Sequence, residues 1–114
     1  MSTELNINTL SGLENHYRSY IKAINSLPSS TLDPYLAETI NHNDKQLSKL
    51  EYHDLIIPKS IFKILDIVTD LEKRKISARL DITLGNGKKV KENVFYQFNE
   101  GWEIERVWSM VEFL

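Results

Sequence analysis

The spacing of apolar residues divides the chain into a helical first half and a β-rich second half. Within residues 11–27, apolar side chains recur every three or four positions, which places them on one face of a helix. These residues are Leu13, Tyr17, Tyr20, Ile21 and Ile24. Ser11, with Glu14 three positions later, matches a capping box that would begin this helix, and Pro28 would end it.

Residues 28–58 are more polar and predict only short elements. Asp33 followed by Pro34 indicates a helical turn at residues 32–36. Residues 40–44 are rich in turn formers, so we expect a polar turn there that carries His42. Residues 48–57 predict a second short helix, which Pro58 would end. Its expected buried positions are Leu47, Leu50, Leu55 and Ile56.

From residue 61 onward, apolar and polar residues follow the two-residue period that is typical of strands. We expect strands at residues 61–71, 76–84, 90–98 and 102–113. Gly85-Asn86-Gly87 is a strong hairpin signal, and residues 99–101 form a second turn. Helices followed by hairpin-connected strands predict an α+β fold, with the helices on one face of a curved antiparallel sheet.

Composition and charge narrow the possible classes of protein. The chain has 114 residues, of which 41% are hydrophobic and 26% charged, as expected of one globular domain spanning 1–114 with a loose segment at 1–10. The net charge of −2 argues against nucleic acid as the main partner. The lack of cysteine excludes disulfides and thiolate metal sites. No apolar run approaches the ~20 residues of a membrane span, so we expect a soluble, cytoplasmic protein without a membrane partner.

Several short motifs, taken in order, resemble the SnoaL-like polyketide cyclases, which belong to the superfamily of the nuclear transport factor 2 fold. The motifs are His42-Asn43 with Tyr52, Ser77-Ala78-Arg79-Leu80, Phe95-Tyr96 with Gly101, and Val107-Trp108-Ser109. The similarity runs from about Leu13 to Glu112. It implies a cone in which a strongly bent sheet wraps around the N-terminal helices and leaves an open pocket. It also implies a homodimer formed through the convex face of the sheet.

The resemblance further implies a general base near the end of the last strand. Glu112 occupies that place, although the usual residue of the family is Asp. Trp108, Met110 and Glu112 share one face of the predicted strand. If this face lines the pocket, its apolar groups would raise the pKa of the carboxyl and make it a usable proton shuttle. The carboxylate can equally be solvated, and the alternation does not decide which face is inside.

The remaining candidates for catalysis are His42, at the pocket mouth, and Tyr17, because dehydratases of this fold use tyrosines to polarise a carbonyl. A turn-stabilising or exposed histidine and core tyrosines are the alternatives. Residues expected to bind substrate are Trp108, Tyr35, Tyr96, Met110 and Tyr20. His16 and His53 are expected on the surface. Since no histidines have metal-ligand spacing, we expect neither a metal nor another cofactor.

Two functions remain open at this point. The first is a pocket protein that acts on a small apolar carbonyl compound as a cofactor-independent lyase or isomerase, such as an aldol cyclase, isomerase or dehydratase. Glu112 would be its base, and a tyrosine or His42 would stabilise the enolate oxygen. The second is a non-catalytic ligand-binding or dimeric interaction module, whose pocket is wholly or partly filled by Phe95, Trp102 and Trp108.

Overall fold

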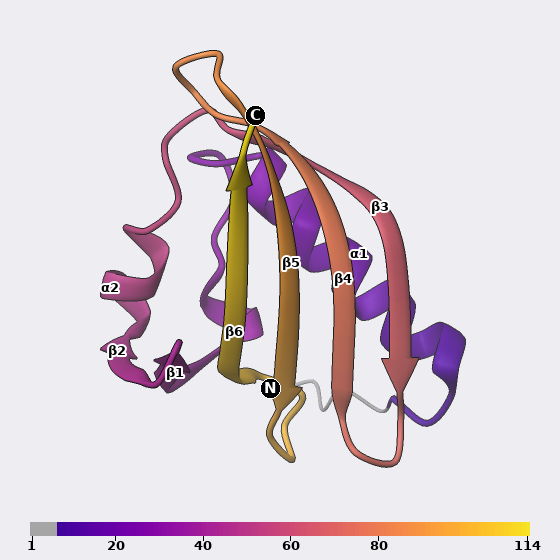
Figure 1. The fold of residues 1–114 in the computed structure, drawn as a ribbon. Helices are drawn as coiled ribbons and strands as arrows, with labels where there is room; N and C mark the ends of the chain where they lie inside the picture. Colours follow the sequence, from indigo (N-terminus) through magenta and orange to yellow (C-terminus); the bar gives the residue numbers. More distant parts are fainter. Residues whose placement is uncertain (1–6) are drawn as a thin grey trace.

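The computed structural model describes residues 7–114, which form a six-stranded sheet crossed on one face by a long helix (Figure 1). The elements are α1 (Leu10–Asn25), a 3₁₀ turn (Asp33–Tyr35), β1 (Leu36–His42), β2 (Lys45–Ser48), α2 (Lys49–His53), β3 (Ile61–Asp70), β4 (Lys75–Thr83), β5 (Lys89–Phe98) and β6 (Ile104–Phe113). The strand order in the sheet is β2-β1-β6-β5-β4-β3. Residues 1–6 of the segment predicted to be loose lie outside the described residues. No helix among the described residues is long and apolar enough to cross a membrane.

Strands β3 to β6 form the antiparallel meander that the two-residue period predicts. In β4, Ile76, Leu80 and Ile82 are buried, whereas Arg79 between them is exposed. Register shifts interrupt the β3–β4 and β5–β6 pairings, and such bulges increase the bend and twist of a sheet. The predicted α+β class, with α1 on one face of a bent sheet, is confirmed.

A hairpin stands where the sequence predicts only a polar turn. β1 pairs with β2 around Asn43 and Asp44, which both have positive φ values (49° and 67°). β1 also pairs in parallel with β6, so the sheet is mixed and the expectation of a wholly antiparallel sheet is wrong. The pattern of apolar residues does not predict β1, because the register between β1 and β6 shifts between Leu36 and Asn41. Two adjacent buried residues are therefore followed by two exposed ones, which hides the alternation.

Helix α1 buries the predicted apolar stripe against the sheet. Its N-terminus differs from the prediction, because the cap is Thr9, whose hydroxyl accepts a hydrogen bond from the backbone N–H of Gly12 (2.9 Å). Ser11 therefore lies inside the helix rather than before it. The helix ends at Asn25, ahead of Pro28.

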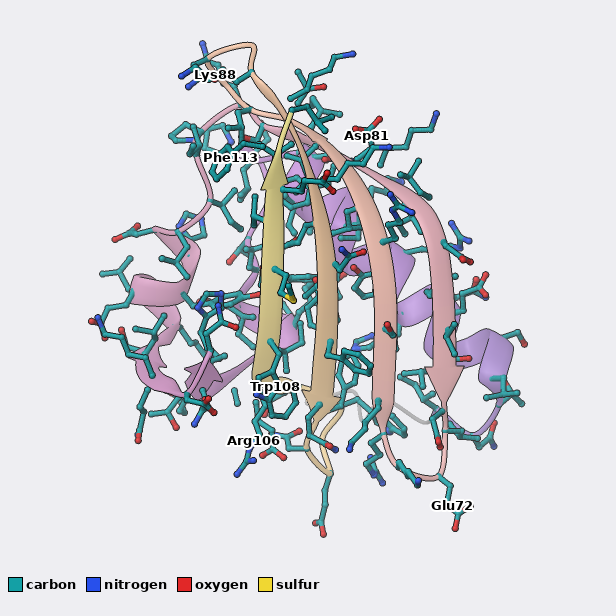
Figure 2. The ribbon with its side chains drawn as sticks, in the orientation of Figure 1. Glu72, Asp81, Lys88, Arg106, Trp108 and Phe113 are labelled. Atoms are coloured by element: carbon teal, nitrogen blue, oxygen red, sulfur yellow. The ribbon has the colours of Figure 1, made fainter. Side chains whose placement is uncertain are left out.

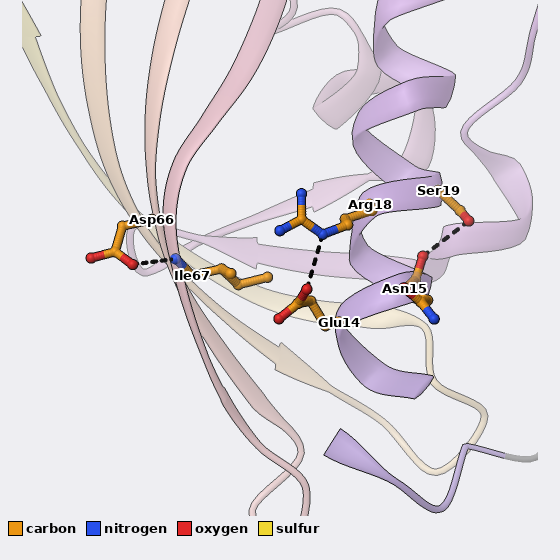
Figure 3. Close-up of polar contacts among 6 residues, drawn as sticks. All are labelled: Glu14, Asn15, Arg18, Ser19, Asp66 and Ile67. Atoms are coloured by element: carbon orange, nitrogen blue, oxygen red, sulfur yellow. Dashed lines mark hydrogen bonds and ion pairs between the residues drawn. The ribbon is translucent and has the colours of Figure 1, made fainter. Parts of the chain in front are cut away.

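The opposite side of α1 carries polar contacts, shown in Figure 3. Arg18 Nε lies 3.0 Å from Glu14 Oε2 one turn earlier, and the Ser19 hydroxyl donates to the Asn15 carbonyl. Both members of the ion pair are exposed, and such i,i+4 pairs contribute about 0.3–0.5 kcal/mol. The fold of α1 against the sheet therefore depends on its apolar stripe.

The expectation that His16 lies on the surface is wrong, because its side chain is buried. It is three residues from Leu13, so it shares the buried side of α1. Its Nε2 donates to the carbonyl oxygen of Trp102 (2.9 Å), and its ring packs against Tyr35 and Phe98. Trp102 has a φ of 62°, so His16 holds a left-handed residue of the β5–β6 connection in place.

Helix α2 is shorter than predicted, and its inward side differs. Ser48 and Glu51 form a complete capping box. Leu50 and Leu55, expected to be buried, are 69% and 52% exposed, whereas Tyr52 is buried. Because α2 makes little more than one turn, it directs only this tyrosine into the core.

Candidate functional site

A cavity of about 270 Å³ lies between the inner face of the sheet, α1 and the segment after α2. Strands β4, β5 and β6, together with residues 55–57, give it mostly apolar walls. The residues with polar side-chain groups in its lining are Tyr20, His42, Tyr52, Ser60, Glu92 and Tyr96. A largely apolar cavity with a few converging polar groups is the usual form of a small-molecule site.

The carboxyl group of this cavity belongs to Glu92, in the first half of β5. Glu92 is half-buried and shares the inner face of its strand with the buried Val90 and Val94. The hydroxyl of Ser109, on the neighbouring strand β6, donates a hydrogen bond to it. Burial raises the pKa of Glu92, and the hydrogen bond from Ser109 opposes this effect in part. A carboxyl group shifted in this direction is better suited to exchange protons near neutral pH.

Four buried tyrosines place their hydroxyls in two hydrogen-bonded pairs next to this carboxyl. Tyr17 donates to the hydroxyl of Tyr96, and the hydroxyls of Tyr20 and Tyr52 also lie 3.2 Å apart. Burial raises the pKa of all four, so they stay protonated at neutral pH. Within each pair, one hydroxyl donates its hydrogen to the oxygen of the other. The O–H of the accepting tyrosine therefore remains able to donate to another acceptor. Such O–H groups can donate to an oxygen of a ligand.

His42, at the end of β1, completes the polar part of the lining. It is half-buried, and its ring lies 5.9 Å from that of Tyr52, between ring centroids. Burial lowers the pKa of His42, which favours its neutral form. A neutral imidazole can donate or accept a hydrogen bond at this position.

Asn43 fixes the end of β1 against β6. Its side chain donates to the carbonyl of Ser109 (3.2 Å) and accepts from the backbone N–H of Ser109 (2.8 Å). Its own backbone N–H donates to Val107 O (2.9 Å). The side chain therefore continues the strand pairing by one step, and it positions both His42 and the serine that contacts Glu92.

The structure distributes the sequence-predicted residues over both faces of the sheet. Tyr20, Tyr96 and His42 lie in the cavity wall. Tyr17 lies behind Tyr96 and reaches the site only through its hydrogen bond. Tyr35 packs against the rings of His16 and Tyr20 instead of lining the cavity.

Of the two orientations that the sequence left open for the last strand, the structure has the one that turns Glu112, the predicted general base, away from the cavity. Cross-strand neighbours share a face, and Val107, on the inner face, pairs with the buried Tyr96. Two residues along, Ser109 pairs with Val94, so the inner face of β6 continues through Val111 and Phe113. The other set, Trp108, Met110 and Glu112, faces outward, and Glu112 is exposed opposite Lys91. Trp108 and Met110 are therefore not in the cavity wall.

Glu92 is not among the residues predicted above, although the sequence contains a signal for it. It interrupts the apolar face that Val90, Val94 and Tyr96 form at alternate positions of β5. A charged residue on the buried face of a strand is uncommon, and it indicates a partner or a function.

The aromatic residues expected to fill the pocket lie elsewhere. Phe95 is 53% exposed on the outer face, and Trp102 is buried against Phe98, beyond the cavity wall. Trp108, labelled in Figure 2 near the lower end of β6, borders an outer groove of about 450 Å³. Exposed apolar side chains in this groove include Val68, Phe95 and Met110.

Among residues 7–114, no three histidine, aspartate or glutamate side chains come together in a way that could hold a metal ion. The polar side chains in the cavity wall carry a carboxyl group, an imidazole, phenolic hydroxyls and the hydroxyl of Ser60.

Solved structures are similar to this chain, whereas no protein-family model and no curated protein match it. A SnoaL-like polyketide cyclase from Agrobacterium tumefaciens has a TM-score of 0.75 at 25% identity, covering 93% of both chains. A protein of unknown function from Cytophaga hutchinsonii, described as NTF2-like, has a TM-score of 0.70 at 17% identity, covering 98% of this chain and 95% of its own. A candidate polyketide cyclase from Streptomyces antibioticus has a TM-score of 0.65 at 12% identity, covering 87% and 91%.

Proposed function

We propose that this chain, which has the nuclear transport factor 2-like fold of the SnoaL-like polyketide cyclases, binds a small carbonyl compound and catalyses a cofactor-free proton transfer on it. The observation that carries the proposal is the environment of Glu92, a carboxyl with a raised pKa in an apolar cavity lined by tyrosine hydroxyls. The name of the Agrobacterium tumefaciens relative supports the same class of reaction.

The reaction would begin with removal of a proton from the carbon beside the ligand's carbonyl group. Glu92 accepts this proton, and the electrons of the C–H bond move to the carbonyl oxygen to form an enolate. The free O–H groups of the tyrosine pairs, at Tyr96 and at Tyr20 or Tyr52, donate to this oxygen. One such donor contributes roughly 10²–10³ in rate in other enzymes.

Two outcomes of the enolate are chemically balanced. Where the ligand has a carbon–carbon double bond next to the deprotonated carbon, the enolate extends to a dienolate, and Glu92 can return the proton to its far carbon, which shifts the double bond and isomerises the ligand. Alternatively, the enolate carbon attacks a second carbonyl of the same ligand, and the new alkoxide takes the proton from Glu92, which gives an aldol cyclisation. His42 at the cavity wall can hydrogen-bond to this second oxygen.

The exchange of C–H for C–D in heavy water tests the first step without knowledge of the natural ligand. We expect the wild-type protein to accelerate exchange at the carbons beside the carbonyl of 2-hexanone, measured by NMR. Glu92→Gln should reduce the rate to the uncatalysed level. Glu112→Gln makes the same chemical change on the outer face and should leave the rate unchanged. Exchange that survives Glu92→Gln, or fails in all three proteins, would contradict the proposal.

A second function, a dimeric interaction module, is favoured by the outer groove. Val68, Phe95 and Met110 are 65%, 53% and 75% exposed on one sheet face. Exposed apolar patches of this kind mark interaction sites, and we propose that a second copy of the chain covers this one. Sedimentation should give a dimer for the wild type and a monomer for Phe95→Glu with Met110→Glu. Leu50→Glu, on α2, should remain dimeric, and a monomeric wild type would contradict this assignment.

A further inference from the structure

We propose that the ligand of the cavity carries an apolar chain that leaves through the mouth and lies on an apolar rim. This inference rests on the function proposed above and extends it to the class of ligand. The rim consists of Leu55, Ile57, Val111 and Phe113.

The rim residues are exposed and belong to the cavity at the same time. Leu55 and Ile57 follow α2 and are 52% and 42% exposed, while Val111 and Phe113 end β6 and are 46% and 76% exposed. All four also line the cavity. Figure 2 labels Phe113 at the upper end of β6. Single exposed apolar residues are normal on a protein surface, but four at one opening form a continuous apolar path from the interior to solvent.

The size of the cavity supports a ligand that is longer than the cavity itself. At about 270 Å³, the volume of the open cavity falls below the roughly 300–1,000 Å³ typical of ligand sites. A compound that places its carbonyl near Glu92 and continues over the rim would bury more apolar surface than the cavity alone allows. Apolar burial is the main source of affinity for such a chain.

Both sides of the rim are held in place before any ligand arrives. The Ile57 carbonyl accepts from the backbone N–H of Ser60, and the Ser60 hydroxyl accepts from that of Gly85 (3.2 and 3.1 Å). Phe113 pairs with Val90 in the β5–β6 ladder. A preformed surface loses little conformational freedom on binding, which favours affinity.

Two other occupants of the rim fit the observations less well. A stable protein interface covers about 800 Å² on each partner, which is more than four side chains around an opening can supply. A membrane surface attracts basic residues, whereas the described lining contains no lysine or arginine and the chain carries a net charge of −2. A neutral apolar chain on the ligand is the occupant that matches this chemistry.

Calorimetric titration with two ketones of different length tests the inference. We expect 2-decanone to bind the wild type roughly tenfold or more tightly than 2-hexanone, since a partly buried methylene adds about twofold. Leu55→Ser and Phe113→Ser should each weaken the binding of 2-decanone several-fold and change the affinity for 2-hexanone by less than about twofold. Leu50→Ser removes an exposed leucine outside the lining (69% exposed, against 52% for Leu55) and should change neither affinity.

The possible results separate this inference from the proposed function. If 2-hexanone binds and exchanges through Glu92 but 2-decanone gains nothing, the rim is not a chain subsite and the proposed function stands. If neither ketone binds, both proposals fail. If Phe113→Ser dissociates a dimer, or abolishes binding to neutral phosphatidylcholine vesicles, the rim serves another occupant and the inference is overturned.

Discussion

The hydroxyl of Ser109 on β6 donates a hydrogen bond to the carboxyl group of Glu92 on β5, inside the cavity. The side-chain amide of Asn43 forms two hydrogen bonds with the backbone of the same serine (2.8 and 3.2 Å). Strands β5 and β6, together with the β1–β2 turn that carries Asn43, thereby fix the acidic group of the site. The hydroxyl also opposes part of the pKa increase that burial imposes on Glu92.

Replacing this serine should shift the pH dependence of proton exchange. In Ser109→Ala, the pKa of Glu92 loses the hydrogen bond that lowers it and should rise further. Proton exchange at the ketone needs the carboxylate form of Glu92. The midpoint at which the exchange rate rises with pH should therefore lie at a higher pH in Ser109→Ala than in the wild type. Ser77→Ala, on the outer face, provides the matched control. An unchanged pH midpoint in Ser109→Ala would argue that the hydroxyl does not act on Glu92.

Removing the carboxyl group should stabilise the fold at neutral and higher pH. The pKa of Glu92 in the folded state lies above its ordinary value of 4.5, so the folded protein binds more protons than the unfolded chain at pH values between the two pKa values. Stability is therefore lost as the pH rises from 4.5 through the folded pKa. Glu92→Gln should raise the free energy of unfolding at pH 8 by about 0.5–2 kcal/mol, a common size for stabilising substitutions.

Urea denaturation of both proteins at pH 4 and pH 8 measures this effect. The free energies of unfolding of the wild type and Glu92→Gln should differ less at pH 4, because Glu92 is then largely protonated in both the folded and the unfolded state. A Glu92→Gln protein that is less stable than the wild type at pH 8 would show that the carboxylate is a structural group.

His16 should make the fold sensitive to mild acid. Burial lowers its pKa below the ordinary value of 6.5, so the unfolded chain binds the proton more readily than the folded protein does. Stability should therefore fall as the pH decreases from about 6.5 towards the folded pKa. His16→Gln can keep the hydrogen bond to Trp102 but cannot titrate, so its melting temperature should fall less over this range. His53→Gln, at a partly exposed position, should behave as the wild type does.

Gly85 should tolerate no side chain, because the hairpin it begins lies against the segment at the cavity mouth. A Cβ atom at Gly85 would lie 1.9 Å from the carbonyl oxygen of Pro58. Gly85→Ala should therefore lower the free energy of unfolding by about 1–3 kcal/mol, the usual cost of overpacking. Gly101→Ala meets its nearest atom at 3.5 Å and should cost less. Thermal unfolding compares the two variants. Equal melting temperatures would show that the backbone around Pro58 and Gly85 can move apart without loss of stability.

The long elements could be predicted because their patterns are local. The stripe of α1 and the alternation in β3 to β6 follow directly from the backbone periods of a helix and a strand. Asn86, between two glycines, marks the β4–β5 turn for a similar reason, since such residues adopt turn conformations readily. Charge and composition likewise required no structure.

The β1–β2 hairpin and the burial of His16 depended on contacts between distant segments. β1 is short, and it is completed by parallel pairing with β6 and by the side chain of Asn43. His16 finds its acceptor in Trp102, 86 positions along the chain. No local period contains such information.

The sequence by itself determined that a helix would cover a bent sheet and that acids and tyrosines would lie on its strands and helix. Only the tertiary structure decided which carboxyl group faces inward. Glu112 and Glu92 both sit in alternating strands, and a shift of one residue exchanges the two faces of a strand. The pairing of β6 with the buried positions of β5 sends Glu112 outward and leaves Glu92 in the cavity, because strand register is fixed by neighbouring strands.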